Sequence, residues 1–355
     1  MHRRAALLTA AALALAGTPA LAGPAQAAPT GLDPRPAGWS LADSSSERRT
    51  VLQYWNAQRM RAARPLSTPA LRRGTTSATG PSRGTPWASK VTAAPRRAII
   101  TRHGERGAAW SFDGARGGAT TTAAVPNSPG LRWTDGGAVV RTVGRVFFTT
   151  ADGRNSSCSG TAVTSANESV VMTAGHCVKL NGAAHRNWVF VPGFDNGRRP
   201  LGTWVASRVV TTQQWNDRED INFDLAAVVV APLEGRTLTD VVGGQGVAFN
   251  QPRQRQNFAF GYPAADPFDG SALVYCSGRA FDDTVQTRDQ GLRCGMTGGS
   301  SGGPWFQGFD ERTGLGWLNS VNSFTYNFAP NFMFGPFFGD EAMAVYQAAQ
   351  NIDAT

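Results

Sequence analysis

From Val143 onward the sequence is a succession of short apolar runs, each followed by Gly, Pro, Asn or Asp. The runs are rich in β-branched and aromatic residues, which favour the pleated surface of a sheet. Their spacing predicts an all-β fold, a barrel or a sandwich, with turns between the strands. The runs are residues 145–150, 169–173, 187–191, 203–210, 224–230, 246–249, 257–260, 272–276 and 317–326.

Two segments have a helical period instead. Residues 44–63 begin with Ser44 and Glu47 at capping-box spacing, and their apolar residues fall near one face while arginines fill the other. Near the end of the chain, Asp340 can cap a segment in which Ala342 and Tyr346 share a face. We therefore expect one helix near residues 44–63 and another at the C-terminus.

The segment 1–27 has the three parts of a secretory signal peptide. Arg3 and Arg4 form the basic start, residues 5–22 form the apolar run, and residues 25–27 (Ala-Gln-Ala) form a small-x-small cleavage site. A membrane anchor is the alternative, but turn-forming residues interrupt a run that falls short of the roughly 20 apolar residues needed to span a bilayer. The protein is therefore expected to be secreted, with no membrane attachment after cleavage.

The segment after the signal peptide is basic, unlike the rest of the chain. Residues 28–141 contain 17 basic and 6 acidic residues, whereas residues 142–355 contain 15 basic and 19 acidic residues. From residue 64 to about residue 130 the composition is typical of a linker, rich in Pro, Gly, Ser, Thr, Ala and Arg.

We interpret residues 28–135 as a prosegment with a helix near residues 44–63, followed by the functional domain at residues 136–355. The opposite charges of the two parts favour docking of the prosegment on the domain, where it can act as an intramolecular inhibitor. Arg72-Arg73 and Arg96-Arg97 are candidate points for its removal. An ordinary flexible basic tail is the alternative.

The chain has four cysteines, which secretion would place in an oxidising compartment. An even number favours two disulfides, for which three pairings are possible. The sequence-local pairing, Cys158 with Cys177 and Cys276 with Cys294, closes loops of about 20 residues, each worth about 3 kcal/mol in the chain-entropy model. A zinc site is the alternative, but C-x-x-C and H-E-x-x-H spacings are absent, so no metal is expected; scattered carboxylates leave calcium binding open.

The stretch from Gly295 to Trp305, Gly-Met-Thr-Gly-Gly-Ser-Ser-Gly-Gly-Pro-Trp, surrounds two serines with five glycines. Glycine serves where the backbone takes a positive φ or comes close to another group, which indicates a turn shaped for a ligand. A serine hydroxyl becomes a nucleophile only beside a base. His176, at the end of a strand run, is the candidate base, and Cys177 can tether it to Cys158. His185 lies in a polar loop and is expected to be solvated.

A catalytic imidazole also needs an acceptor on its far nitrogen, which fixes the tautomer and stabilises the imidazolium. Asp224 is the first candidate, because it opens the most apolar strand run and would be carried inward with it. Asp220 is the second, since a less regular run follows it. The alternative is that these residues are ordinary strand-end and loop residues.

Three motifs stand in the order His, Asp, Ser: Thr-Ala-Gly-His-Cys at residues 173–177, Phe-Asp-Leu-Ala-Ala at 223–227 with its strand-opening aspartate, and Gly-Gly-Ser-Ser-Gly-Gly-Pro-Trp at 298–305. With them the chain resembles the trypsin/chymotrypsin superfamily of serine peptidases over residues 143–350. The closest likeness is to secreted bacterial members of the glutamyl-endopeptidase branch and their actinobacterial trypsin-like relatives.

The resemblance implies a chymotrypsin-like fold of two six-stranded antiparallel β-barrels with a catalytic triad of His176, Asp224 and Ser301. It also implies an oxyanion hole formed by the main-chain N–H groups of Gly299 and Ser301. Ser300 departs from the trypsin-like members, which carry an aspartate there that pairs with the amino terminus released on activation. That form of zymogen activation is therefore not expected, and other contacts, such as the bridge at Cys294, must hold the loop.

The resemblance says less about primary specificity. Gly295 stands six residues before Ser301, where trypsin-type enzymes place an aspartate, so a preference for Arg or Lys is not expected. Glutamyl endopeptidases use a histidine where this chain has Asn322, which puts a preference for Glu in doubt. Thr297 and Thr325 remain available to bind a carboxylate. The substrate-binding residues implied are Gly295, Thr297, Asn322, Ser323, Phe324 and Thr325, with Phe324 either a pocket wall or a buried strand residue.

The sequence therefore predicts a secreted, monomeric serine endopeptidase that cleaves polypeptides through an acyl-enzyme and needs no cofactor. The domain has no P-loop, dinucleotide fingerprint or aromatic-basic patch, so nucleic acid is not an expected partner. One alternative is an esterase with the same triad, although the Gly-x-Ser-x-Gly elbow is absent. The other is a catalytically inactive homologue that binds a protein or the cell wall.

Overall fold

The computed structural model describes residues 35–74, 79–91 and 127–354, and the predicted signal peptide lies outside them. Strands predominate in this part of the chain, and none of its helices is long and apolar enough to cross a membrane. The helices are α1 (Ser45–Tyr54), α2 (Ala57–Ala62), α3 (Val139–Thr142), α4 (Gln213–Arg218), α5 (Leu238–Val242) and α6 (Asp340–Gln350), with 3-10 turns η1 (Gly175–Cys177) and η2 (Ile221–Phe223).

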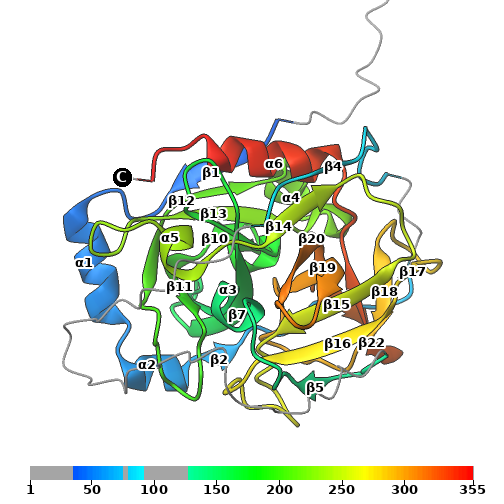
Figure 1. The fold of residues 1–355 in the computed structure, drawn as a ribbon, viewed down its shortest axis with the longest axis horizontal. Coiled ribbons are helices and arrows are strands. Elements are labelled where there is room, and N and C mark those ends of the chain that lie inside the picture. Colours follow the sequence, from blue (N-terminus) through cyan, green and yellow to red (C-terminus); the bar gives the residue numbers. More distant parts are fainter. Residues whose placement is uncertain (1–34, 75–78, 92–126, 355) are drawn as a thin grey trace, which may run out of the picture. The chain divides into compact units, whose positions relative to one another are not determined.

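Six antiparallel strands close into a barrel in the first half of the β-rich region (Figure 1). The strands pair in the order β11, β6, β7, β8, β13 and β12, and β12 pairs again with β11. Their bounds are β6 (Val143–Thr149), β7 (Asn155–Val163), β8 (Val170–Thr173), β11 (Arg186–Pro192), β12 (Trp204–Thr211) and β13 (Ala226–Val230). A short hairpin of β9 (Lys179–Leu180) and β10 (Ala183–Ala184) lies between β8 and β11.

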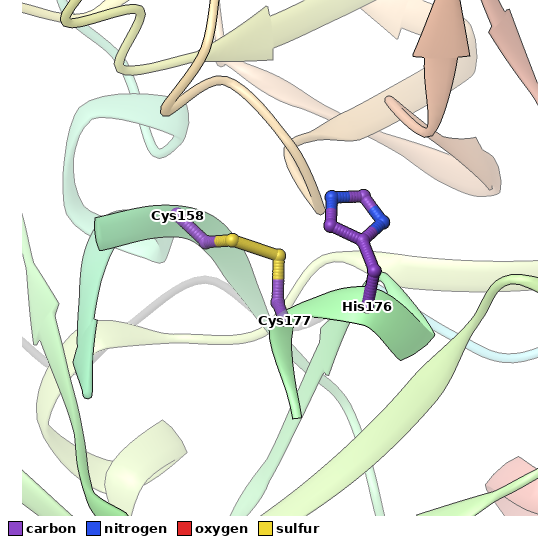
Figure 2. A group of neighbouring side chains, drawn as sticks. All are labelled: Cys158, His176 and Cys177. Atoms are coloured by element: carbon purple, nitrogen blue, oxygen red, sulfur yellow. A yellow bond between two sulfur atoms is a disulfide. The ribbon is translucent and has the colours of Figure 1, made fainter. Parts of the chain in front are cut away.

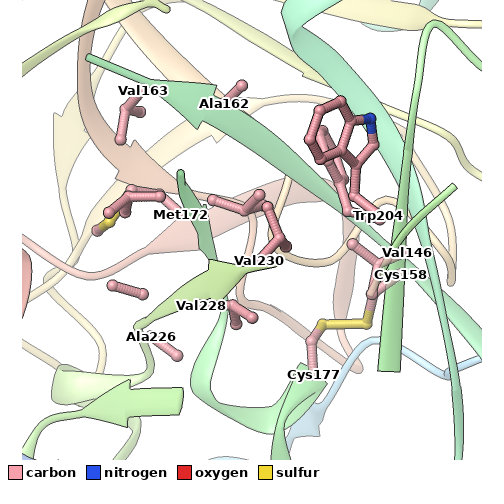
Figure 3. Packing of buried hydrophobic residues seen from close by; sticks show 14 of the residues in the cluster. Val146, Cys158, Ala162, Val163, Met172, Cys177, Trp204, Ala226, Val228 and Val230 are labelled. Atoms are coloured by element: carbon pink, nitrogen blue, oxygen red, sulfur yellow. A yellow bond between two sulfur atoms is a disulfide. The ribbon is translucent and has the colours of Figure 1, made fainter. Parts of the chain in front are cut away.

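The barrel interior is filled by β-branched and aromatic side chains. Val146, Trp204 and Val228 are fully buried there and pack around the disulfide of Cys158 (Figure 3). Burial of one such side chain contributes about 1.5 to 3 kcal/mol. The strand ends and the loops that follow them are therefore held by a rigid core.

The second half forms two sheets. In the first, β14 (Gly246–Phe249), β20 (Leu315–Val321), β19 (Pro304–Asp310), β15 (Gln256–Gly261) and β16 (Val274–Arg279) pair in that order, between edge strands β4 (Trp87–Ala88) and β5 (Leu131–Arg132). In the second, the order is β17 (Phe281–Asp282), β18 (Gln290–Arg293), β22 (Ala329–Gly335), β21 (Phe324–Tyr326) and β3 (Ala70–Leu71).

The expected fold class is confirmed, with two differences in the second half. The first barrel is closed, the second half is β structure and the chain ends in a helix. β14 and β20 pair in parallel, however, and no strand pair among the described residues joins the two sheets of the second half.

The helix expected over residues 44–63 is divided into α1 and α2. Ser44 caps α1 as expected, since its hydroxyl accepts the N–H of Glu47 (3.1 Å) and its own N–H bonds to the Glu47 carboxylate (2.8 Å). The division falls at Trp55, which is 1% exposed and whose indole N–H donates to the carbonyl of Asn187. The side chain of Asn56 then caps α2. The prediction of a single helix was wrong, because this tertiary contact and the second cap outweigh helix propensity.

Strands also occur before the β-rich region. β1 (Ala37–Ser40) pairs with β12, and β2 (Arg64–Pro65), β3 and β4 pair with β7, β21 and β14. β2, β3 and β4 lie in the stretch expected to be a linker. Two-residue strands have no hydrophobic period, so their position is set by the sheet edges that receive them rather than by their own sequence.

The C-terminal helix α6 differs from expectation in its cap. Gly339 occupies the N-cap position, and Asp340 is the first helical residue, with its carboxylate bonded to the amide of Asn250 (2.8 Å). Ala342 and Tyr346 are buried on one face, as expected. Asp340 is therefore not the cap, because a long-range contact with Asn250 engages its side chain.

Candidate active site

His176 lies in η1, directly after strand β8. Its neighbour Cys177 is joined to Cys158 of β7 by a disulfide, and Cys276 is joined to Cys294, so the pairing is the sequence-local one. Figure 2 shows the His176 imidazole pointing away from the disulfide. His176 and the two sulfur atoms are close enough together for a metal site, but both sulfurs are used in the disulfide. The group offers only an imidazole and cannot hold a metal.

Asp224 lies directly after η2 and faces His176. One carboxylate oxygen, Oδ2, is 2.7 Å from His176 Nδ1, and the other accepts the main-chain N–H of His176 at 2.8 Å. The hydroxyl of Ser323 also donates to Oδ2. All three residues are fully buried. A carboxylate held by three donors fixes both the ring orientation and the Nδ1–H tautomer of His176.

Asp220, the second candidate, has a different place. Its carboxylate accepts the main-chain N–H of Asn222 (3.2 Å) at the start of η2 and pairs with Arg218 (3.2 Å) near the surface. It therefore shapes the turn that carries Asp224.

Ser301 is brought to the same region by packing of its loop against the first barrel. Its carbonyl accepts the N–H of Ser159 (2.7 Å), and a Cβ added to Gly302 would lie 2.8 Å from the main-chain nitrogen of Ala174, two residues before His176. The hydroxyl of Ser301 and the Nε2 atom of His176 are both buried, and neither has a hydrogen-bond partner among the described residues. Neither atom is engaged by another described protein group, so both are available to a reacting group.

Gly299 has the backbone conformation expected of it. Its φ is +94°, and an added Cβ would lie 2.8 Å from the carbonyl oxygen of Tyr262. A larger residue there would be strained and would clash. The N–H of Gly299 donates to the carbonyl of Leu66 (3.1 Å), a residue of the segment before the domain.

Asn322 holds the Ser301 loop in place. Its amide nitrogen donates to the carbonyls of Phe260 (2.9 Å) and Ser300 (3.0 Å), and its amide oxygen accepts the indole N–H of Trp305 (2.8 Å). The Ser300 hydroxyl adds a bond to the carbonyl of Thr297 (2.8 Å). These contacts could not be predicted from the sequence, because Asn322 is 21 positions away from Ser301.

Replacement of Asn322 by alanine is expected to lower the free energy of unfolding by about 3 kcal/mol, because it removes three hydrogen bonds of about 1 kcal/mol each. Urea denaturation measures this loss. Asn319→Ala is the matched control, since the Asn319 amide only contacts the side chain of Gln307 (3.2 Å). Equal losses in the two variants would contradict the role given to Asn322.

The other predicted substrate-binding residues are differently placed. Gly295 donates its N–H to the carbonyl of Pro129 (2.6 Å), and the Thr297 hydroxyl donates to the carbonyl of Ala265 (2.7 Å). Phe324 is fully buried in β21 and stacks on Phe334. Thr325, next in β21, is partly exposed and bonds through its main-chain N–H to the carbonyl of Pro69 (2.9 Å).

His185 is buried, and the expectation that it is solvated was wrong. The side chain is 2% exposed and stacks on Phe148, with ring centroids 4.3 Å apart. Its Nε2–H donates to the carbonyl of His176 (3.0 Å), so His185 supports the turn that carries His176. Burial lowers the pKa of His185 to about 4, which keeps the ring neutral in the folded protein near neutral pH.

The free energy of unfolding is accordingly expected to fall as the pH drops from about 6.5 toward 4. The unfolded chain binds a proton at His185 in this range and the folded chain does not, so the slope contributed is at most about 1.4 kcal/mol per pH unit. His185→Gln keeps an N–H donor but does not titrate. Urea unfolding of both proteins at pH 4.5 to 7.5 should give a flatter profile for this variant, and identical slopes would refute the assignment.

Solved structures of bacterial proteases are similar to this chain. The protease Anisep from Arthrobacter nicotinovorans is 41% identical, with a TM-score of 0.59, over 63% of this chain and 100% of that one. The thermostable serine protease AL20 from an extremophilic microorganism is 44% identical, with a TM-score of 0.57, over 60% of this chain and 98% of that one. No family model and no curated protein sequence matches the chain.

Proposed function

This chain belongs to the trypsin/chymotrypsin-like bacterial serine peptidases, which are hydrolases, and from this premise we propose that it is a secreted serine endopeptidase with a triad of His176, Asp224 and Ser301. The observation that carries the proposal is the buried pair of Asp224 Oδ2 and His176 Nδ1, 2.7 Å apart. Nε2 of the same ring is not engaged by another group within the described residues, so its lone pair is available to accept the Ser301 proton.

The proposed reaction begins when Ser301 Oγ attacks the carbonyl carbon of a peptide and His176 Nε2 takes the hydroxyl proton. The carbonyl oxygen becomes an oxyanion, which the main-chain N–H groups of Gly299 and Ser301 stabilise; loss of one such donor typically costs about 3 to 4 kcal/mol in the barrier. His176 then gives its proton to the leaving nitrogen as the C–N bond breaks. Water repeats the sequence on the acyl-enzyme and releases the acid.

Asp224 supports both proton transfers in this proposal. Its three donors, His176 Nδ1–H, His176 N–H and the Ser323 hydroxyl, keep the carboxylate in one orientation. A buried carboxylate stabilises the imidazolium more strongly than an exposed one does, because water screens it less. The resemblance implies that Ser323 binds substrate. In this proposal Ser323 also helps to orient the carboxylate of Asp224.

For primary specificity we propose a preference other than Arg or Lys. Gly295 offers no charge at the position where trypsin-type enzymes carry aspartate. The side chains of Asn322 and Thr297 bond to protein groups, which leaves the partly exposed Thr325 as the better placed polar residue for a substrate.

The proposed precursor has three parts: a signal peptide at residues 1–27, a prosegment at 28–135 that acts as an intramolecular inhibitor, and a monomeric peptidase domain at 136–355. The two disulfides support an extracellular location, because they suit an oxidising compartment.

Incubation of the secreted, matured protein with casein and a biotinylated fluorophosphonate tests this function. We expect the rate of casein cleavage to fall in proportion to the fraction of protein labelled. Each chain should take one label, which mass spectrometry should map to Ser301. A matured protein that neither cleaves casein nor takes the label would support an inactive homologue instead.

A further inference from the structure

The site is covered by part of the chain that precedes the domain. Residues 64–71, here called the cleft segment, run from the first barrel to the second half. At one end Arg64 and Pro65 pair in parallel with Ser156 and Ser157 of β7. At the other end Ala70 and Leu71 pair in parallel with Thr325 and Tyr326 of β21.

Leu66 stands at the centre of the cleft segment. Its N–H donates to the carbonyl of Ser157 (2.9 Å), and its carbonyl accepts the N–H of Gly299 (3.1 Å). The cleft segment therefore occupies a donor of the proposed oxyanion hole. Its carbonyl lies where the substrate carbonyl oxygen would have to bind.

Side chains add to these main-chain bonds. Leu71 packs against the apolar cluster of Phe324, Tyr326 and Phe334 in the second half, and Leu66 packs against the main core. With this segment in place both His176 and Ser301 are fully buried. A polypeptide cannot reach Ser301 until the cleft segment leaves.

We propose that the cleft segment occupies the substrate cleft in the direction opposite to a substrate, and so acts as a peptide inhibitor that the enzyme does not cut. This inference rests on the proposed function. The direction follows from the position of the imidazole, which must reach the leaving nitrogen. Nδ1 of His176 faces Asp224, which also binds the hydroxyl of Ser323 next to β21, so Nε2 lies on the side of the ring away from β21. His176 also adjoins Cys177, whose disulfide with Cys158 ties this turn to the neighbouring Ser157 of β7. The leaving half of a substrate therefore lies toward β7 and its acyl half toward β21.

The cleft segment runs the opposite way to such a substrate. The residues before the Leu66 carbonyl lie on β7 and the residues after it lie on β21. The nitrogen of the Leu66–Ser67 bond consequently points toward β21, away from the group that would protonate it. A substrate running the other way would also pair with β21 antiparallel, which is the more stable arrangement per residue.

Cleavage of the chain after the cleft segment is not expected to activate the enzyme by itself. Arg72 and Arg73 follow the cleft segment directly and are exposed, so a trypsin-like protease can cut there. That cut removes no hydrogen bond made by residues 64–71. We therefore expect the nicked chain to stay inhibited until the cleft segment dissociates.

The first experiment measures access to Ser301 in the full, uncut chain, as the rate of labelling by a biotinylated peptidyl phosphonate. Leu66→Pro removes the N–H bonded to Ser157, and Leu71→Asp places a charge in an apolar cluster. Each is expected to raise the rate at least tenfold over the natural chain. Leu52→Asp is the matched control, because Leu52 is 37% exposed on α1, away from the cleft segment, and its rate should equal that of the natural chain.

The outcomes separate the two proposals. Equal, fast labelling of the natural chain and both variants would overturn the inhibitor and leave the endopeptidase intact. If no protein is labelled, even after residues 1–135 have been removed by proteolysis, the endopeptidase proposal itself fails.

The second experiment tests direction by disulfide trapping in the inactive Ser301→Ala chain. The observed register predicts cross-links in Arg64→Cys with Ser156→Cys and in Ala70→Cys with Thr325→Cys. The opposite direction predicts them in Ala70→Cys with Ser156→Cys and in Arg64→Cys with Thr325→Cys. Non-reducing mass spectrometry identifies the pairs that form. Formation of the second set, or of neither set, would overturn the proposal.

Discussion

Replacement of Ser301 by alanine is expected to lower kcat for casein-derived peptides by about 10⁶-fold and to abolish fluorophosphonate labelling, because a residue that acts as the nucleophile within a triad has no substitute. KM should change little, since the hydroxyl bonds to no other described group and its loss leaves the cleft intact. Steady-state kinetics on the matured protein measure both constants. The loop should remain folded, because its main-chain bonds do not involve the Ser301 hydroxyl.

The neighbouring serine provides the matched control for this variant. The Ser300 hydroxyl donates to the carbonyl of Thr297 (2.8 Å), so Ser300→Ala loses one loop contact and no reacting atom. We expect its kcat to stay within about tenfold of the natural protein, the cost of about one hydrogen bond. If Ser301→Ala turned over substrate at the natural rate, or if only Ser300→Ala lost labelling, Ser301 would not be the nucleophile.

Asp224→Asn is expected to lower kcat by about 10⁴-fold, because an amide can present its N–H₂ group to His176 Nδ1 and so favour the wrong tautomer. Three donors converge on the Asp224 carboxylate, and an amide oxygen cannot accept all of them in the same geometry. Far-ultraviolet circular dichroism should match the natural protein, and kcat with a chromogenic peptide reports the loss.

Asp220→Asn is the control for charge and position. Asp220 lies four residues earlier, caps η2 and pairs with Arg218 at the surface. Its kcat is expected to stay within about tenfold, since a partly exposed ion pair contributes up to about 1 kcal/mol. If Asp220→Asn were the more damaged variant, Asp220 rather than Asp224 would be the partner of His176.

The parts of the fold that follow a local rule could be predicted from the sequence. Strand runs such as residues 224–230 carry β-branched residues that suit few other structures, and they form the closed barrel. The Ser44 capping box is likewise a rule over three residues, and α1 begins after it. The candidate His176 and Asp224 could be chosen for the same reason, because each follows or opens an apolar run.

The parts that depend on distant partners could not be predicted. Trp55 interrupts a helix because its indole bonds to Asn187, and Asp340 is diverted from capping by Asn250. His185 stands in a polar stretch of sequence but is buried by contact with Phe148. The cleft segment is the largest omission, since residues 64–71 have a linker composition and gain their strands only from the edges of β7 and β21.

The pairing of β1 with β12 has a consequence for the matured protein. β1 pairs with residues Arg208–Thr211 of β12, on the edge of β12 opposite to the one that pairs with β13. If residues 28–135 depart, a row of main-chain donors and acceptors opens to solvent, and such an edge can recruit a strand from a second molecule. Arg208, the lone charged residue of β12, would then lose Asp43 and stand unpaired on that edge, where its charge opposes fibre-like stacking. Under the proposed maturation, the precursor therefore shields a surface that its product must keep soluble by electrostatic repulsion.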